Sequence, residues 1–139
     1  VPAHPALGSL LSIARRHPLD AARIMTGGSL PLRPEYLVRQ LNPARAKEIA
    51  DRCGKESPLA QYQLLLHRPS APPRGSAPML VLATPDDALV PIADVRATAQ
   101  RYGAEMVEFP GMGHDLMLDR AWREPARAML SWLADQPSR

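Results

Sequence analysis

The sequence predicts an α/β fold in which parallel strands with flanking helices follow a helical segment. Three observations support this prediction. Residues 7–68 show short apolar patterns at helical spacing, residues 69–78 form a proline-rich connector, and residues 79–134 alternate short apolar runs with helical patterns. The order strand, helix, strand, helix, with about twenty residues between the strands, is that of a βαβ unit and therefore predicts parallel pairing.

Four short helices are predicted in the first segment, each bounded by a breaker or a capping residue. The residue before a proline disfavours the helical conformation, glycine ends helices, and asparagine or serine before proline starts them. The predicted helices run through residues 10–14, 21–25, 43–53 and 58–66, with boundaries at His17-Pro18, Gly27-Gly28, Asn42-Pro43, Gly54 and Ser57-Pro58. Helices this short are stable only when they pack on something else.

The part after the connector predicts two strands and two helices. Residues 79–83 (MLVLA) form an unbroken apolar run, which is typical of a strand buried on both faces. A polar turn follows, then a helix over 91–102 that Gly103 ends, a second strand over 105–109 and the turn PGMGH. A last helix is expected over 119–134, with one apolar stripe formed by Trp122, Ala126, Met129, Leu130 and Leu133.

Composition and charge exclude several classes of protein. The net charge is +3, but 15 of the 17 basic residues are arginines dispersed along the chain, and an aromatic content of 4% is too low for a base-stacking surface. We therefore expect no nucleic-acid partner. No apolar run approaches the roughly 18 residues of a membrane span, and no stretch reads as a secretory leader, so we expect no membrane partner and a cytoplasmic location.

Residues that could bind a metal are sparse and scattered. Cys53 is the only cysteine, which excludes an internal disulfide, and we interpret it as a structural residue near a helix end. His4, His17 and His67 have no partner at metal-ligand spacing and are interpreted as helix-boundary or surface residues. We therefore expect no metal and no organic cofactor.

Two polar turns follow the predicted strands, and together they carry an acid and a histidine. Asp86-Asp87 come after the first strand and His114 after the second. Parallel strands end at the same edge of a sheet, so these side chains should lie close together. An acid beside a histidine fixes its tautomer and stabilises the imidazolium, which is the supporting half of nucleophilic acyl transfer. We predict that Asp87 and His114 lie within hydrogen-bond reach.

The segments PMLVLATPDDALVP and EMVEFPGMGHDLML, with the last helix, resemble the final βαβα unit of the α/β-hydrolase family, in which the acid also precedes the histidine. The resemblance implies that Asp87, in a D-x-x-V-P turn, is the acid of a catalytic triad and that His114, in a G-x-G-H turn, is its base. Asp86, one residue away, remains an alternative acid. The family commonly inserts a helical cap, so the resemblance implies a cap or lid over residues 1–70 and the C-terminal βαβα part of the hydrolase core over 71–139.

The sequence departs from the family at the nucleophile. No G-x-S-x-G motif occurs, because Ser9, Ser29 and Ser76 lack the second glycine and none follows a predicted strand. In this family the two oxyanion-hole donors would also lie upstream of Val1, and residues 1–5 resemble the exit from the strand before the cap. We therefore expect the nucleophile, a serine or an aspartate, in a missing N-terminal half or partner chain.

These observations predict a hydrolase that cleaves an ester, lactone or related carbonyl bond of a small-molecule substrate, with this chain supplying the acid and the base. The alternative is a non-catalytic truncated remnant or binding subunit that pairs with an N-terminal partner. Two parallel strands need more neighbours than this chain supplies, so exposed strand edges also predict self-association.

Two interpretations of neighbouring residues stay open. Asp115 is either a solvated turn carboxylate or an additional support for His114. Met25, Met112 and Met117 belong either to ordinary core packing or to an apolar substrate pocket under the cap.

Overall fold

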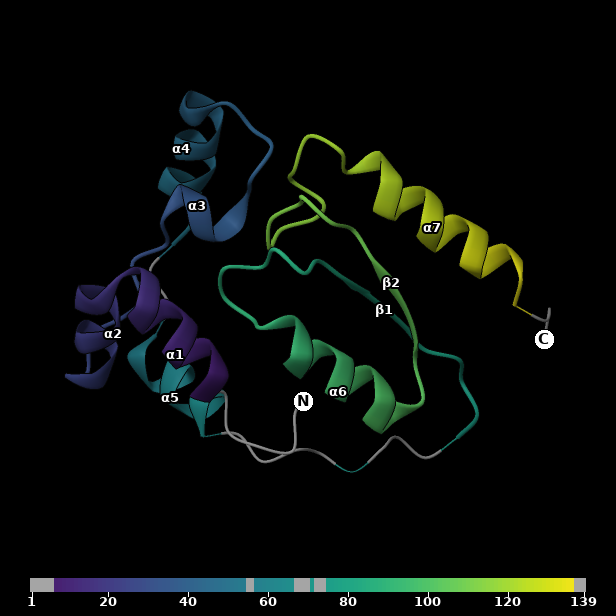
Figure 1. The fold of residues 1–139 in the computed structure, drawn as a ribbon, viewed down its shortest axis with the longest axis horizontal. Coiled ribbons are helices and arrows are strands. Elements are labelled where there is room, and N and C mark those ends of the chain that lie inside the picture. Colours follow the sequence, from purple (N-terminus) through teal and green to yellow (C-terminus); the bar gives the residue numbers. More distant parts are fainter. Residues whose placement is uncertain (1–6, 55–56, 67–70, 72–74, 137–139) are drawn as a thin grey trace.

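The computed structural model describes residues 7–54, 57–66, 71 and 75–136. It is a mixed α/β structure, mostly helical, with two parallel strands flanked by helices. The elements in chain order are α1 (Leu7–Arg16), α2 (Pro18–Met25), α3 (Pro34–Leu37), α4 (Pro43–Arg52), α5 (Pro58–Leu65), β1 (Leu80–Ala83), α6 (Ile92–Tyr102), β2 (Glu105–Glu108) and α7 (Arg123–Ala134). The helices α1–α5 gather at one end, and the strands with α6 and α7 form the other (Figure 1).

The predicted helix boundaries are confirmed at the proline positions. The helices α1 and α2 meet at His17, which is therefore a helix-boundary residue as predicted. Asn42 caps α4 by accepting a hydrogen bond of 2.8 Å from the backbone N–H of Arg45. Ser57 occupies the corresponding position before α5 without making a side-chain capping bond. The four-residue helix α3 was not predicted, because so short a segment carries no periodic pattern.

The end of α4 differs from the prediction that Gly54 stops it. The helix ends at Arg52, and Cys53 follows in an extended conformation with φ −70° and ψ 129°. The Cys53 side chain packs against a cluster that includes the buried Leu37 and Val38. Cys53 is thus a structural residue at a helix end, as its position in the sequence indicates.

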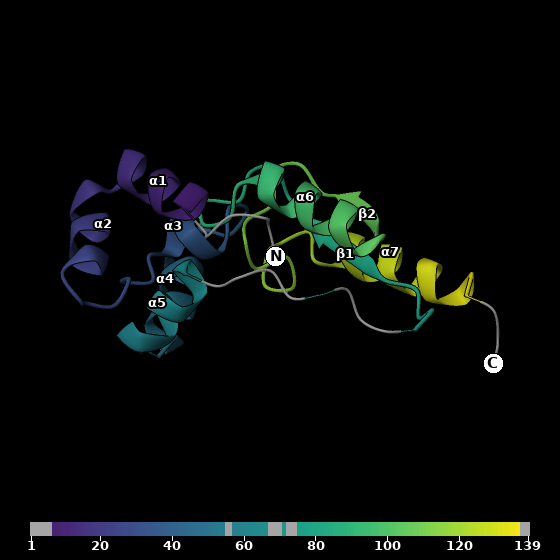
Figure 2. The ribbon, with the colours of Figure 1, turned by 90° about the horizontal axis from the view of Figure 1, so that it is seen from below.

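The two strands form a parallel sheet in which Leu80 pairs with Glu105 and Ala83 with Glu108. Each strand is one residue shorter than predicted. Gly103 ends α6 in the left-handed conformation, at φ 62°, which glycine adopts without steric cost. Figure 1 shows α6 and α7 on opposite sides of the strands, and Figure 2 gives the same arrangement from below. The carboxyl ends of both strands point toward the helical end of the molecule.

The last helix begins later than predicted and turns a different face toward the strands. It starts at Arg123 because the residues just before it form turns. Ala128 packs against the cluster that also contacts Leu82 of β1 and Val107 of β2. The indole N–H of Trp132 donates a hydrogen bond of 2.8 Å to Glu105. Small residues allow the helix to approach the sheet, whereas the larger members of the predicted stripe remain exposed: Trp122, Met129, Leu130 and Leu133.

Most buried apolar side chains of the described residues fall into three separate clusters. These are Ile13, Ala21 and Ile24; Leu37, Val38 and Ala46; and Phe109, Met112 and Leu116. Hydrophobic contacts within one domain usually form a single contiguous core. Although β1 is apolar throughout, three of its four residues are only half-buried. The sheet is therefore incompletely covered by the part of the chain that the structure describes.

Some predictions concern segments outside the described residues. These are residues 1–5 with His4, His67, and half of the connector over 69–78, namely residues 69, 70 and 72–74. None of the described helices combines the length and the apolar character that crossing a membrane requires.

Candidate active site

The carboxyl ends of β1 and β2 bring Asp87 and His114 together. The Nδ1 atom of His114 lies 2.7 Å from Oδ2 of Asp87, which confirms the predicted hydrogen-bond contact. The Asp87 side chain is 10% exposed and the His114 side chain 37% exposed. Because a carboxylate can only accept, Nδ1 carries the proton and donates it, so Nε2 of the neutral ring is an acceptor. Asp87 is the only hydrogen-bond partner of the ring among the described residues.

The neighbouring acid Asp86 has a different role. Its Oδ2 atom accepts a hydrogen bond of 2.6 Å from the backbone N–H of Gly111. Asp87 instead uses Oδ1 to accept the backbone N–H groups of residues 89 and 90, at 2.7 and 3.0 Å, which leaves Oδ2 for His114. The turn thus orients the Asp87 carboxylate toward the ring. Of the two acids left open by the sequence, Asp87 is the one that contacts the histidine.

The electrostatic environment makes His114 a stronger base. The hydrogen bond to Asp87 raises the pKa of His114 above its ordinary value, partial burial opposes this rise, and the charge of Asp115 adds to it. Burial also raises the pKa of Asp115. The Asp115 side chain makes no hydrogen bond with any described residue, so its support of His114 is electrostatic. A higher pKa strengthens the ring as a proton acceptor.

Both glycines of the turn before His114 have a steric reason. Gly111 has a φ of +84°, a backbone conformation that residues with a side chain rarely adopt. Gly113 lies against the segment that follows α3: a Cβ atom there would be 2.6 Å from the carbonyl oxygen of Leu37 and 2.6 Å from Cα of Val38. The G-x-G pattern therefore lets the histidine turn bend sharply and touch backbone from the helical segment.

A buried carboxylate that sequence reasoning missed lies beneath this turn. Asp119 is 1% exposed, and it accepts backbone N–H groups from Arg39, Gln40, Gly113 and Arg120 at 2.8 to 3.0 Å. Burial raises the pKa of Asp119, but these four donors outweigh burial and hold it below the ordinary value. The only sequence signal for its burial is that apolar residues lie close to it on both sides, in DLMLDRAW.

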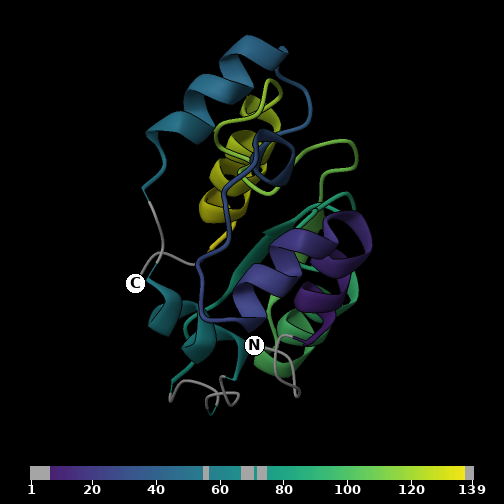
Figure 3. The same cartoon turned by 90° about the vertical axis from the view of Figure 1, so that its left-hand side faces the viewer.

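An ion pair between α2 and the residue that precedes α3 fixes the chain shortly before the segment that Asp119 binds. Asp20 is 4% exposed, and Arg33 donates to both of its oxygens at 2.6 and 3.0 Å. The hydroxyl of Tyr36 donates to Asp20 at 2.8 Å, and Arg33 and Tyr36 together keep the pKa of Asp20 low despite its burial. This network anchors α3, after which the chain runs past the loop that follows β2 (Figure 3).

No nucleophile is brought to His114 within the described residues. Ser9 lies in α1, Ser29 in the loop after α2 and Ser76 before β1, and none of them hydrogen-bonds to the ring. Over the same part of the chain, no three His, Cys, Asp or Glu side chains group closely enough to hold a metal ion. The site therefore presents an oriented base whose Nε2 atom accepts no hydrogen bond from any described residue.

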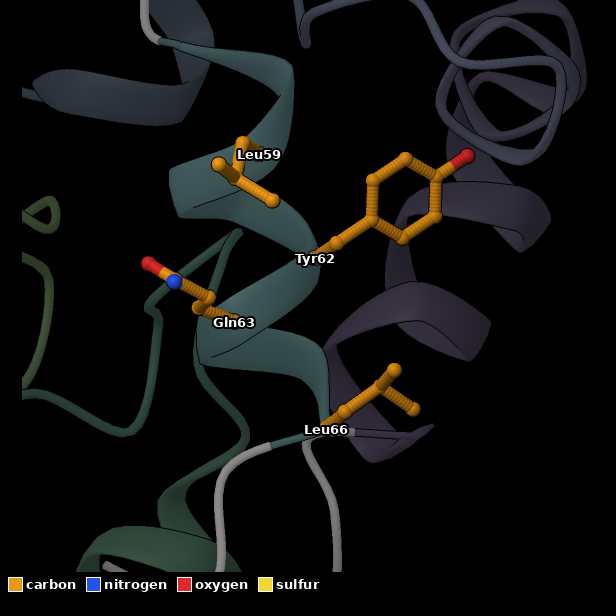
Figure 4. A pocket seen from close by; sticks show the side chains of 4 residues that line it. All are labelled: Leu59, Tyr62, Gln63 and Leu66. Atoms are coloured by element: carbon orange, nitrogen blue, oxygen red, sulfur yellow. The ribbon is translucent and has the colours of Figure 1, made fainter.

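Described residues also form two surface hollows, one of them away from the Asp87 turn and one bordering it. One, of about 610 Å³, is lined by four residues of α5 and its end, Leu59, Tyr62, Gln63 and Leu66 (Figure 4). In that hollow the Tyr62 hydroxyl donates to the backbone carbonyl of Ile24 at 2.6 Å. The other, of about 530 Å³, is lined in part by Arg39 and Ala88, so it borders the turn that holds Asp87.

Of the three methionines, only Met112 fits one of the two interpretations. Met112 is 1% exposed and packs in the cluster with Phe109 and Leu116, which identifies it as core. Met25 and Met117 are 64% and 69% exposed, and neither lines one of these hollows.

The sequence was compared with protein families and with curated proteins. No protein-family model matches the chain. No curated protein is significantly similar to it in sequence.

Proposed function

We propose that this chain supplies the acid and the base of an α/β-hydrolase that cleaves an ester, lactone or related carbonyl bond of a small molecule. The observation that carries the proposal is the 2.7 Å contact between Asp87 and His114 at the ends of adjacent parallel strands. It is supported by the orientation of Asp87, by the raised pKa of His114 and by the resemblance of the two turns to those of the family.

In this reaction His114 works through its Nε2 atom. As a serine hydroxyl attacks the carbonyl carbon, Nε2 takes the hydroxyl proton and Asp87 stabilises the resulting imidazolium. The tetrahedral intermediate then expels the leaving oxygen, to which Nε2 returns the proton. Water repeats the two steps on the acyl-enzyme and releases the acid. The nucleophile and the oxyanion donors belong, in this proposal, to an N-terminal half or partner chain, in a cytoplasmic protein without a cofactor.

The state of the sheet supports such a partner. Among the described residues β1 pairs only with β2, so each strand leaves one edge without a hydrogen-bonded neighbour. The helix α7, which contacts β1, also exposes large apolar side chains, including Leu130 at 66%. Parallel sheets are normally covered on both faces and rarely consist of two strands.

The same observation favours a second candidate function. A chain with an unpaired strand edge and an exposed apolar helix face can also serve as a non-catalytic remnant or binding subunit, which pairs with an N-terminal partner and uses His114 only structurally. Turnover separates the two candidates.

The test uses the chain alone and the chain produced with the coding sequence that precedes Val1. We expect the chain alone to hydrolyse an activated ester no faster than a histidine background, and the longer protein to turn over. His114→Gln should lower that turnover by about a thousandfold or more, whereas Lys47→Gln, an exposed residue of α4, should leave it unchanged.

Three results would contradict parts of this proposal. A longer protein inactive on esters and lactones would favour the remnant. Equal loss in the His114 and Lys47 variants would remove the catalytic role of His114. Turnover by the chain alone that Ser9→Ala, Ser29→Ala or Ser76→Ala abolishes would place the nucleophile within these residues.

A further inference from the structure

Asp119 has the contacts of a residue that holds other groups in place. Its carboxylate is buried and accepts four backbone N–H groups, which come from three separate stretches of chain: residues 39–40, Gly113 and Arg120. The 39–40 stretch lies about eighty positions earlier in the sequence, in the helical segment. A single side chain thus joins the helical segment to the turn of the base.

The turn is fixed on both sides of the histidine. The N–H of Gly113, just before it, donates to Asp119 at 2.8 Å, and the N–H of Asp115, just after it, donates to the carbonyl oxygen of Leu37 at 2.8 Å. Gly113 has no space to move toward the helical segment, because the backbone of residues 37–38 is already in contact with it. The position of the ring therefore depends on this docking.

We infer that Asp119 is a positioning residue for His114: it locks the histidine turn onto residues 37–40 and so maintains the contact between the ring and Asp87. The catalytic meaning of this inference rests on the proposed function, whereas the positioning itself does not. It also assigns a function to the helical segment, which becomes part of the support of the base and not only a cover.

A carboxylate is required for this role, and an amide of the same shape cannot replace it. Oδ1 of Asp119 accepts from Gln40 and Arg120, and Oδ2 accepts from Arg39 and Gly113. In Asp119→Asn one of these two atoms becomes an NH₂ group, which donates and does not accept. Either orientation of the amide leaves two of these N–H groups facing a donor.

The imidazole pKa reports the contact independently of activity. The carboxylates that raise it are Asp87 and Asp115, whereas Asp119 acts on it only through geometry. NMR titration of the protein should therefore give a lower His114 pKa in Asp119→Asn than in the unmodified protein. Asp115→Asn is the matched control, because it removes a nearer charge but none of the four backbone contacts.

We expect the pKa to fall further in Asp119→Asn than in Asp115→Asn, and toward the value of Asp87→Asn. An unchanged His114 pKa in a folded Asp119→Asn protein would overturn the inference and leave the proposed function intact. Conversely, if the proposed function is wrong but the inference is right, the unmodified protein will be inactive and its His114 pKa will still fall in Asp119→Asn.

A second measurement covers the case in which Asp119→Asn does not fold. In the unmodified protein, the amide protons of residues 39, 40, 113 and 120 should titrate together, with one pKa below the ordinary aspartate range. As Asp119 takes up its proton, the amide of Asp115, bound to Leu37, should change in the same step. Four independent titrations, or an Asp115 amide that does not respond, would overturn the inference.

Discussion

Replacing Gly113 by alanine tests the contact between the histidine turn and the helical segment. The added methyl group would lie 2.6 Å from the carbonyl oxygen of Leu37, 2.6 Å from Cα of Val38 and 2.9 Å from its carbonyl carbon. All three are backbone atoms, which cannot rotate away as a flexible side chain would. The two segments must therefore separate or shift together.

The size of the effect follows from those two outcomes. Overpacking of this kind costs about 1–3 kcal/mol. Separation would instead break the three hydrogen bonds that backbone N–H groups donate between the segments, those of Arg39 and Gln40 to Asp119 and of Asp115 to Leu37, at about 1 kcal/mol each. We expect Gly113→Ala to lower the free energy of unfolding by about 2–4 kcal/mol.

Urea unfolding of the protein, followed by tryptophan fluorescence, measures this loss. Gly54→Ala is the matched control: no atom lies within 4 Å of its added methyl group, and its φ is not positive. The control should change the free energy of unfolding by less than about 0.5 kcal/mol. If Gly113→Ala matches the control, the close approach between the two segments does not exist in solution.

Three further predictions concern charge, hydrogen bonding and association. The hydrogen bond to Asp87 raises the pKa of His114 in the folded state. The stability that this contact contributes is therefore present below about pH 6.5, and it is lost as the pH rises through the folded pKa. In Asp87→Asn, the free energy of unfolding should lack this decrease with pH. Tyr36→Phe removes the 2.8 Å hydrogen bond to Asp20 and should cost about 1 kcal/mol in urea unfolding, and an unchanged midpoint would speak against the network. Leu130→Glu, on the exposed face of α7, should reduce self-association of the chain in sedimentation velocity without altering its helix content; equal sedimentation of both proteins would exclude this face as the contact.

Local features of the structure follow from residues that act over a few positions. Gly103 ends α6, Asn42 begins α4, and the apolar run MLVLA forms β1, because each depends on backbone conformations available to the residues themselves. The meeting of Asp87 and His114 is also predictable. Consecutive parallel strands end at one edge of their sheet, so residues just after them are neighbours whatever else the chain does.

Other features were decided by contacts between distant parts of the chain. Whether Asp86 or Asp87 faces the ring depends on how the turn closes after β1, which a one-residue difference reverses. The face that α7 turns to the strands depends on how closely its small residues approach them, and the sequence pattern favoured the larger ones instead.

Asp119 is the clearest case. In the sequence it is one acid near the start of a predicted helix, which is ordinarily a solvated position. Its burial and its four backbone partners exist only because the stretch after α3 folds back onto the histidine turn, at a separation of about eighty residues that no local pattern encodes. The sequence by itself determined that an acid and a histidine meet at the ends of neighbouring parallel strands, and only the tertiary structure decided which acid contacts the ring and what holds the pair in position.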